Sequence, residues 1–239
     1  MFLYQIRDRA VRHNDKVKFL EIGLGCDSVY GTGASVPIWK QMFTPGTVIG
    51  TGHGSSSNGA GGNAEYGQDA TWTNFLDLWV ADIDGECVKR AQEAGQLDGV
   101  ASLVGNQSDP EDIHRWIRES SGNFTVIVDD GGHGTDNIIT TFNILWPNLA
   151  PGGLYFIEDL QIQRAWLDDQ PPFADIMNSW IEQLLVRKGS YSFEIDHITP
   201  YIKDMRQKYP IPKRLKWILC QAEACVLAKC HSVDASFCM

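Results

Sequence analysis

The chain has 239 residues, 43% of them hydrophobic and 21% charged, which is ordinary for a water-soluble globular protein. A formal net charge of −10 disfavours nucleic acid as a partner, because an acidic surface repels a phosphate backbone. No apolar run reaches the ~20 residues that a membrane-spanning helix needs, and the first residues are too few and too charged for a signal peptide.

Apolar strands alternate with helical stretches along the chain, with no internal repeat and no linker to a second domain. This alternation predicts a single doubly wound, Rossmann-like α/β domain over residues 1–239, with a mostly parallel sheet. The first strand is predicted to begin near Lys18, which leaves little room for leading helices and is compatible with a domain cut from a longer protein. The compartment therefore stays open, with the cytoplasm as the default expectation and the secretory lumen as the alternative.

The first predicted elements are a helix within residues 1–15 and a strand over Val17–Ile22. The strand ends in E-I-G-L-G, which places Glu21, Gly23 and Gly25 at its carboxyl end. An acid followed by G-x-G at that position is typical of a nucleotide-type binding loop, because glycines let a ligand approach the backbone closely. A helix is expected at Val36–Met42, with Ser35 as its cap.

Residues 50–70 are rich in Gly, Ser and Asn, which predicts a flexible insertion within the domain. The second strand, Phe75–Ile83, brings Asp82 to its carboxyl end, where a carboxylate can accept hydrogen bonds from ribose hydroxyls. Asp84 is expected to cap a helix over Gly85–Ala94. A third strand, Val100–Val104, is followed by Asn106 and Gln107, both candidates for contact with a purine edge.

The central stretch is Thr125–His133, where a buried strand is followed at once by Asp129, Asp130, two glycines and His133. A helix to about Trp146 leads to a second strand of the same design. That strand, Gly153–Asp159, ends in Glu158 and Asp159, and the Pro-Gly-Gly before it is expected to break the chain. Strands of such a unit lie about 4.8 Å apart, so Asp130 and the two later acids can point into one space.

Residues Gln161–Pro172 are predicted to form a loop over the site and Phe173–Arg187 a helix. Residues 189–214 receive no assignment. Leu215–Cys220 and Cys225–Lys229 are predicted to close the sheet as an antiparallel hairpin. The pattern leaves open whether Cys220 and Cys225 form a disulfide, which would fit a secretory compartment, or are two small buried residues.

Five motifs occur in order: L-E-I-G-L-G, G-A-S-x-x-x-W, the strand-end Asp82, G-N-Q-S-D-P, and D-D-G-G-H followed by P-G-G-L-Y-F-I-E-D-L. Together they resemble the class I S-adenosylmethionine-dependent O-methyltransferases of the macrocin and mycinamicin type, which methylate sugar hydroxyls on macrolides. The resemblance runs from about Lys18 to Leu160, outside the insertion. Asn106 stands where this family usually has an Asp.

The resemblance implies S-adenosyl-L-methionine and Mg²⁺ as cofactors and a hydroxylated acceptor, such as a sugar or glycoside, as substrate. It implies His133 as general base, Asp130, Glu158 and Asp159 as metal ligands, and Glu21, Gly23, Gly25, Asp82 and Gln107 as cofactor-binding residues. Asp129 is expected to contact the cofactor amine or to orient the loop.

Two alternatives remain at this point. An NAD-type oxidoreductase is disfavoured because G-L-G-C-D-S lacks the third glycine of G-x-G-x-x-G and because no catalytic Tyr/Lys pair is evident. A catalytically inactive, methyltransferase-like binding domain is not excluded by the sequence. The oligomeric state is also left open.

Overall fold

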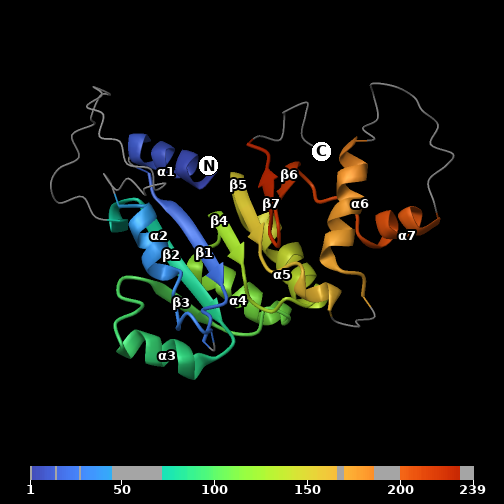
Figure 1. Ribbon diagram of the computed structural model, residues 1–239. Helices are drawn as coiled ribbons and strands as arrows, with labels where there is room; N and C mark the ends of the chain where they lie inside the picture. The colour runs from blue at the N-terminus through green and yellow to red at the C-terminus, as the bar shows by residue number, and fades with distance from the viewer. Residues whose placement is uncertain are drawn as a thin grey trace, which may run out of the picture.

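The computed structural model describes residues 2–13, 15–26, 28–44, 72–165, 170–185 and 200–231. Within these residues, seven strands form one sheet in the order β3-β2-β1-β4-β5-β7-β6 (Figure 1). The strands are β1 (Val17–Ile22), β2 (Leu76–Asp82), β3 (Ala101–Val104), β4 (Phe124–Asp129), β5 (Leu149–Ile157), β6 (Leu215–Cys220) and β7 (Cys225–Lys229). The predicted insertion at residues 50–70 lies outside the described part.

Strands β1 to β5 pair in parallel, and β7 runs antiparallel to both β5 and β6. The predicted Rossmann-like sheet with an antiparallel C-terminal hairpin is therefore confirmed. The strand order reverses between β1 and β4, which lie side by side at the centre. In open α/β sheets this reversal opens a crevice at the carboxyl ends of the strands, and ligands bind there.

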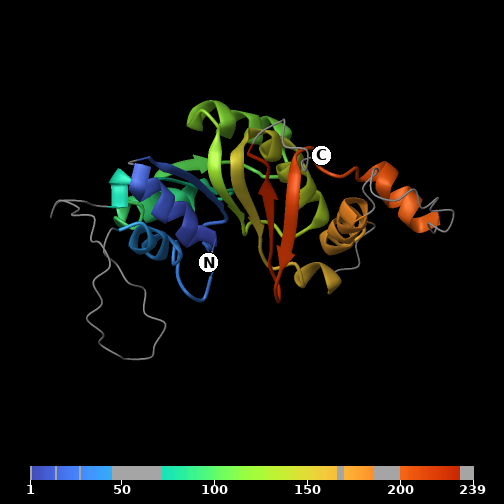
Figure 2. The same cartoon turned by 90° about the horizontal axis from the view of Figure 1, so that it is seen from above.

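Helices cover both faces of the sheet (Figure 2). The hydrophobic core on one face includes residues of the first three helices, and the core on the other face includes residues of the last four. The first group is α1 (Phe2–His13), α2 (Val36–Met42) and α3 (Gly85–Glu93), and the second is α4 (Pro110–Ser120), α5 (Thr135–Asn148), α6 (Phe173–Leu185) and α7 (Pro200–Lys208). The neighbours Phe19 and Leu20 on β1 belong to opposite cores, as expected for successive side chains of a strand buried on both faces.

Two local predictions are wrong. The Pro-Gly-Gly sequence does not precede β5 but lies inside it, because β5 already begins at Leu149. Leu149 pairs with Phe124 and Leu154 pairs with Val126, so the extra residues between them form an irregularity that the strand accommodates. Ser35 directly precedes α2 but makes no side-chain capping hydrogen bond.

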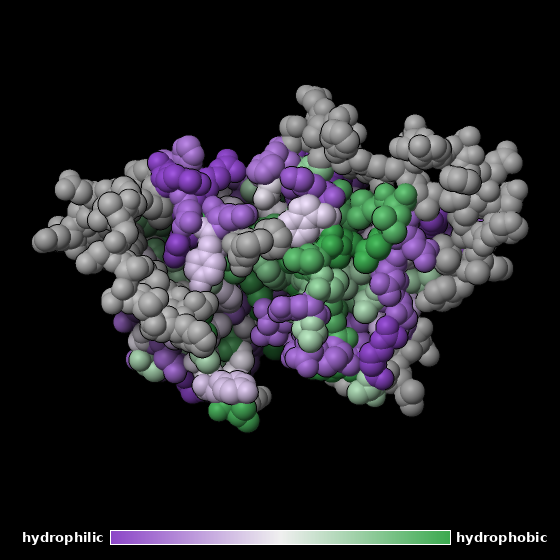
Figure 3. Space-filling model, turned by 45° about the horizontal axis from the view of Figure 1, so that its top comes forward, coloured by the Kyte–Doolittle hydropathy of each residue, from purple (hydrophilic) through white to green (hydrophobic). Residues whose placement is uncertain are grey.

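No helix of the described residues is long and apolar enough to cross a membrane. The space-filling view shows hydrophobic side chains gathered right of centre on one face, next to hydrophilic ones (Figure 3). The disulfide alternative for the closing hairpin is confirmed, because Cys220 and Cys225 are bonded.

Candidate active site

A cavity of about 550 Å³ opens at the carboxyl edge of the sheet, beside the central strands β1 and β4. The loop after β1, the end of β2, the segment after β3 and the turn after β4 all contribute to its wall. The predicted site residues on the wall are Gly23, Gly25, Asp82, Gln107, Asp130, His133 and Asp159. The topology thus collects residues from five strand ends around one space.

The glycine loop after β1 lies directly against the turn after β4. Gly23 has a φ of 95°, and a Cβ atom added to it would lie 2.1 Å from the carbonyl oxygen of Asp130. Only glycine satisfies both the left-handed backbone and this close approach. The backbone N–H of Asp130 also donates to the carbonyl of Ile22, at 2.9 Å, which joins the two strand ends.

Asp82 connects the glycine loop to the segment after β2. One carboxylate oxygen accepts a hydrogen bond from the backbone N–H of Leu24 at 2.8 Å, and the other accepts from the backbone N–H of Asp84 at 2.9 Å. A carboxylate has about four lone-pair sites, so Asp82 keeps acceptor capacity toward the cavity. Asp84 caps α3 as predicted, through bonds from the backbone N–H groups of Glu86 and Cys87.

Asp129 is not on the cavity wall and is only 2% exposed. Its carboxylate accepts hydrogen bonds from Gln107 Nε2 and from the Tyr155 hydroxyl, both at 3.0 Å. The other end of the Gln107 amide accepts from the backbone N–H of Gly132 at 2.6 Å. One glutamine therefore joins the buried carboxylate to the turn that carries Asp130 and His133.

Burial raises the pKa of Asp129 to about 7, although hydrogen bonds from Gln107, Tyr155 and the backbone of Gly131 favour the ionised form. The pKa of Tyr155 is raised well above its usual value, first by burial and then by the charge of Asp129. Because both groups are sealed from water, their bond holds a fixed geometry at the end of β4.

Asp130, His133 and Asp159 come together on the cavity wall, where one potential ligand atom from each lies within 4.8 Å of the others. His133 Nε2 is 3.7 Å from a carboxylate oxygen of Asp159. Glu158 lies outside this group but is close enough that the charges of Asp130 and Asp159 raise its pKa. Of the predicted metal ligands and base, three residues are therefore clustered and the fourth is a near neighbour.

The acids of this cluster repel one another. Burial and the charge of Asp159 raise the pKa of Asp130 to about 6. Burial followed by the charges of Asp130 and Asp159 raises the pKa of Glu158, and His133 opposes the rise. Several carboxylates that resist ionising side by side are a site that a divalent cation would stabilise, because the cation replaces repulsion with attraction.

Glu21 is not on the cavity wall. It is 3% exposed and faces α2, where burial raises its pKa to about 7 against the lowering effect of the Ser35 and Trp39 side chains. The Ser35 side chain therefore favours the ionised form of this carboxylate and does not cap the helix. Among the described residues, Glu21 Oε2 has no hydrogen-bond partner.

Sequence reasoning missed Tyr155 and Gln163. Tyr155 is one apolar-looking position of a strand, and nothing in the pattern says that its hydroxyl meets Asp129. Gln163 lies in the predicted loop over the site, where its Nε2 donates to the carbonyl of His133 at 2.7 Å and its Oε1 accepts from the backbone of Phe173. Gln163 is only 5% exposed, but this burial is visible only in the structure, so the sequence carried no signal for its role.

No protein-family model matches the chain, but its sequence is similar to those of several sugar O-methyltransferases. The 8-demethyl-8-alpha-L-rhamnosyl tetracenomycin-C 2'-O-methyltransferase of Streptomyces olivaceus is 31% identical over 170 residues, covering 68% of this chain and 34% of that protein. The mycinamicin VI 2''-O-methyltransferase of Micromonospora griseorubida is 29% identical over 166 residues, covering 66% and 32%. The predicted resemblance to sugar O-methyltransferases is confirmed.

The chain matches only about a third of the length of these methyltransferases. The fold comparison agrees with the sequence comparison. The MycE methyltransferase of the mycinamycin biosynthetic pathway, solved in complex with Mg and SAH, superposes with a TM-score of 0.58 at 20% identity. The superposition covers 95% of this chain and 47% of MycE, so the two share this fold.

Replacing Tyr155 with Phe removes one of the two side-chain donors to Asp129. We expect the free energy of unfolding to fall by about 1–3 kcal/mol, as for other buried groups that lose a partner. The loss should be larger at pH 8 than at pH 5. Without the hydroxyl, the pKa of Asp129 rises further above about 7, and a group whose folded pKa is raised loses stability as the pH rises through that value.

Urea unfolding at both pH values, with EDTA present, measures this difference. Tyr209→Phe is the matched control, because the Tyr209 hydroxyl donates to the neutral amide of Gln170 at 2.8 Å and its loss should cost the same at both pH values. If Tyr155→Phe lowered the free energy of unfolding equally at pH 5 and pH 8, this would contradict a raised pKa of Asp129 that depends on the Tyr155 hydroxyl.

Proposed function

We propose that this chain is the catalytic part of an S-adenosyl-L-methionine-dependent O-methyltransferase that methylates a hydroxyl of a sugar or glycoside with the help of Mg²⁺. The observation that carries the proposal is the position of the Asp130–His133–Asp159 cluster. It lies on the wall of the same cavity as the glycine loop and Asp82. A methyl donor and a hydroxyl activated at the cluster would therefore meet in one space.

The cavity fits the proposed cofactor. Its volume of about 550 Å³ is within the range of small-molecule and cofactor sites. The glycines at 23 and 25 keep the loop close to the cavity without side chains, and Asp82 keeps acceptor capacity for a diol such as ribose. MycE, which shares this fold, was solved with SAH. Gly23, Gly25 and Asp82 are the residues we assign to cofactor binding.

Gln107 and Asp129 have a different role in this proposal. Both ends of the Gln107 amide and both oxygens of Asp129 already bond within the protein. We assign them to orienting the turn after β4, with the backbone of the segment around Gln107 on the cavity wall. Glu21 supports the glycine loop from behind, from the face of the sheet that α2 covers.

The acidic cluster also fits the proposed metal. Mg²⁺ prefers oxygen ligands, and Asp130 and Asp159, with Glu158 beside them, offer carboxylates that repel one another without a cation. A bound Mg²⁺ would polarise an acceptor hydroxyl and lower its pKa. We assign Asp130, Asp159 and Glu158 as its ligands.

His133 then acts as the general base. S-adenosyl-L-methionine, when bound, would supply the methyl group: the acceptor oxygen would bond to the methyl carbon as the bond from that carbon to the sulfonium sulfur breaks. The hydroxyl proton would pass to the imidazole of His133, a residue that lines the cavity and whose Nε2 is 3.7 Å from a carboxylate oxygen of Asp159. That carboxylate stabilises the imidazolium produced. Gln163 holds the backbone of His133 and so limits the positions the ring can take.

The metal assignment can be tested without an acceptor. Mn²⁺, used in place of Mg²⁺, should bind at one site per chain in an electron paramagnetic resonance titration. Asp130→Asn should weaken this binding by at least about tenfold, because it removes a charged ligand. Asp136→Asn is the control, since it makes the same change at an exposed position nearby in the first turn of α5. Equal Mn²⁺ affinity in the two variants would contradict the assignment.

Testing whether His133 is the general base requires an assay of methyl transfer. Transfer of labelled methyl from S-adenosyl-L-methionine to a panel of rhamnosides and other deoxysugar glycosides should be detectable with the unaltered chain. His133→Ala should reduce it by about 10²-fold or more, in line with the loss of a general base. The affinity for S-adenosylhomocysteine should stay within about twofold, because a base that only takes a proton contributes little to cofactor binding.

His114→Ala, at an exposed position of α4, is the control and should keep full turnover. A fully active His133→Ala variant would show that His133 is not the general base. Tight S-adenosylhomocysteine binding with no transfer to any acceptor would instead favour the inactive binding domain.

A further inference from the structure

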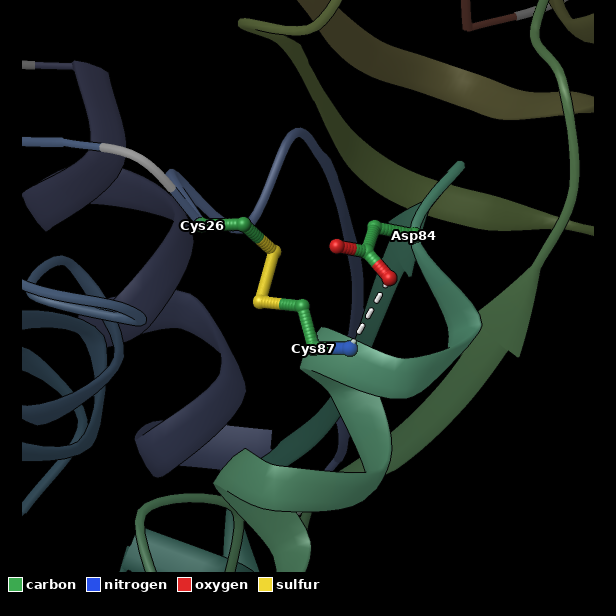
Figure 4. A group of neighbouring side chains, drawn as sticks. All are labelled: Cys26, Asp84 and Cys87. Carbon is green, nitrogen blue, oxygen red and sulfur yellow. Dashed lines mark hydrogen bonds between the residues drawn. A yellow bond between two sulfur atoms is a disulfide. The ribbon is translucent and has the colours of Figure 1, made fainter.

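A disulfide joins the two segments that form the cofactor side of the cavity. Cys26 directly follows Gly25 in the loop after β1 and lines the cavity. Cys87 lies in the first turn of α3, after β2, and is 2% exposed. The two are 61 residues apart in the sequence, and Figure 4 shows their sulfur atoms bonded beside Asp84.

The same two segments are joined by a chain of hydrogen bonds. Leu24 donates to Asp82, which also accepts from the backbone N–H of Asp84. Asp84 in turn accepts from the backbone N–H of Cys87 at 3.0 Å (Figure 4). The disulfide from Cys87 back to Cys26 turns this chain into a closed ring around the carboxylate that we assign to the cofactor.

The base of the glycine loop is well held, because Gly23 donates to the carbonyl of Ala81 at 2.8 Å and Leu24 is only 2% exposed. Beyond Leu24, the described residues before α2 contain no strand or helix, and several of their backbone hydrogen bonds stay within the loop, such as Ser28 to Gly25 and Gly31 to Ser28. Val29 and Tyr30 are 93% and 86% exposed and add no packing. The disulfide at Cys26 therefore anchors the loop at the point where its packed base ends.

We propose that the Cys26–Cys87 disulfide is a positioning element of the cofactor site, so that cofactor affinity depends on the oxidation state of this pair. The inference rests on the proposed function, because it takes S-adenosyl-L-methionine and its product as the ligands. With the disulfide formed, the loop is held in its binding position before the ligand arrives. Without it, the ligand has to order the loop, and affinity falls.

The redox step is a simple exchange. A dithiol reductant supplies two electrons and two protons, the sulfur–sulfur bond breaks into two thiols, and the reductant becomes its own disulfide. Disulfides persist in oxidising compartments and are reduced in others. The chain would therefore bind its cofactor well in an oxidising compartment and poorly in a reducing one.

The test compares two pairs of cysteines. Cys26→Ser/Cys87→Ser removes the proposed positioning disulfide, and Cys220→Ser/Cys225→Ser removes the disulfide of the closing hairpin as a matched control. Calorimetric titration with S-adenosylhomocysteine should show affinity lowered by about tenfold or more in the first variant, the size that lost preorganisation can produce. The control should stay within about twofold of the unaltered chain. Titrations are made well below each variant's melting temperature, so that all are equally folded.

A second readout separates positioning from general damage. The acidic cluster lies in the segments that follow β4 and β5, so Mn²⁺ affinity should be the same in both double variants. Loss of both ligands together in the first variant would mean that the disulfide only stabilises the fold, and would overturn the proposal.

Reduction of the unaltered chain provides the same test if the first variant does not fold. Dithiothreitol treatment should lower S-adenosylhomocysteine affinity, and reoxidation should restore it. Thiol alkylation and mass spectrometry identify which pair has opened at each step. A chelator is present, because reduced Cys26 and Cys87 with Asp84 offer three ligand atoms within 4.8 Å that Zn²⁺ could bridge in place of the disulfide.

Unchanged affinity after Cys26 and Cys87 are open overturns the inference and leaves the proposed function standing. Absence of S-adenosylhomocysteine binding by the oxidised, unaltered chain overturns the proposed function itself. The two failures are therefore distinct.

Discussion

The site depends on one carboxylate that is sealed from water. Asp129 ends β4, and its two oxygens are held by Gln107 and Tyr155. Since successive residues of a strand point to opposite faces, fixing Asp129 toward one face turns Asp130 toward the other. Gln107 also binds the N–H of Gly132, so the turn that carries His133 is fixed by the same group. A buried hydrogen-bond network thus fixes the positions of the acid cluster and of the base. Leaving such a network partly satisfied would cost stability.

Much of this arrangement follows from the sequence. Unbroken apolar runs ending in polar residues predict buried parallel strands, and the carboxyl ends of such strands share one edge. Gly23, Asp82, Asp130, His133 and Asp159 could therefore be expected around one space, and the structure places them on one cavity wall. The closing hairpin was predictable from a different pattern, two short apolar strands that flank a polar turn.

The parts that escaped prediction depend on register and on contacts between distant segments. Asp129 meets Tyr155 only because Asp129 pairs with Ile157 across β4 and β5, and that register is set after the irregularity around Pro151. Cys26 and Cys87 meet because the loop after β1 and the first turn of α3, which follows the adjacent strand β2, lie together, and no spacing along the chain reveals this. Gln107 has an amide that could bind a ligand, but both ends of that amide are hydrogen-bonded within the protein.

The most direct test of the account is calorimetric titration of the oxidised, unaltered chain with S-adenosylhomocysteine, with NAD⁺ titrated in parallel. The glycine loop, Asp82 and the cavity predict one site with micromolar affinity for S-adenosylhomocysteine and no measurable binding of NAD⁺. A folded chain that does not bind S-adenosylhomocysteine, or that binds NAD⁺ more tightly, would contradict the assignment of this cavity to a methyl donor.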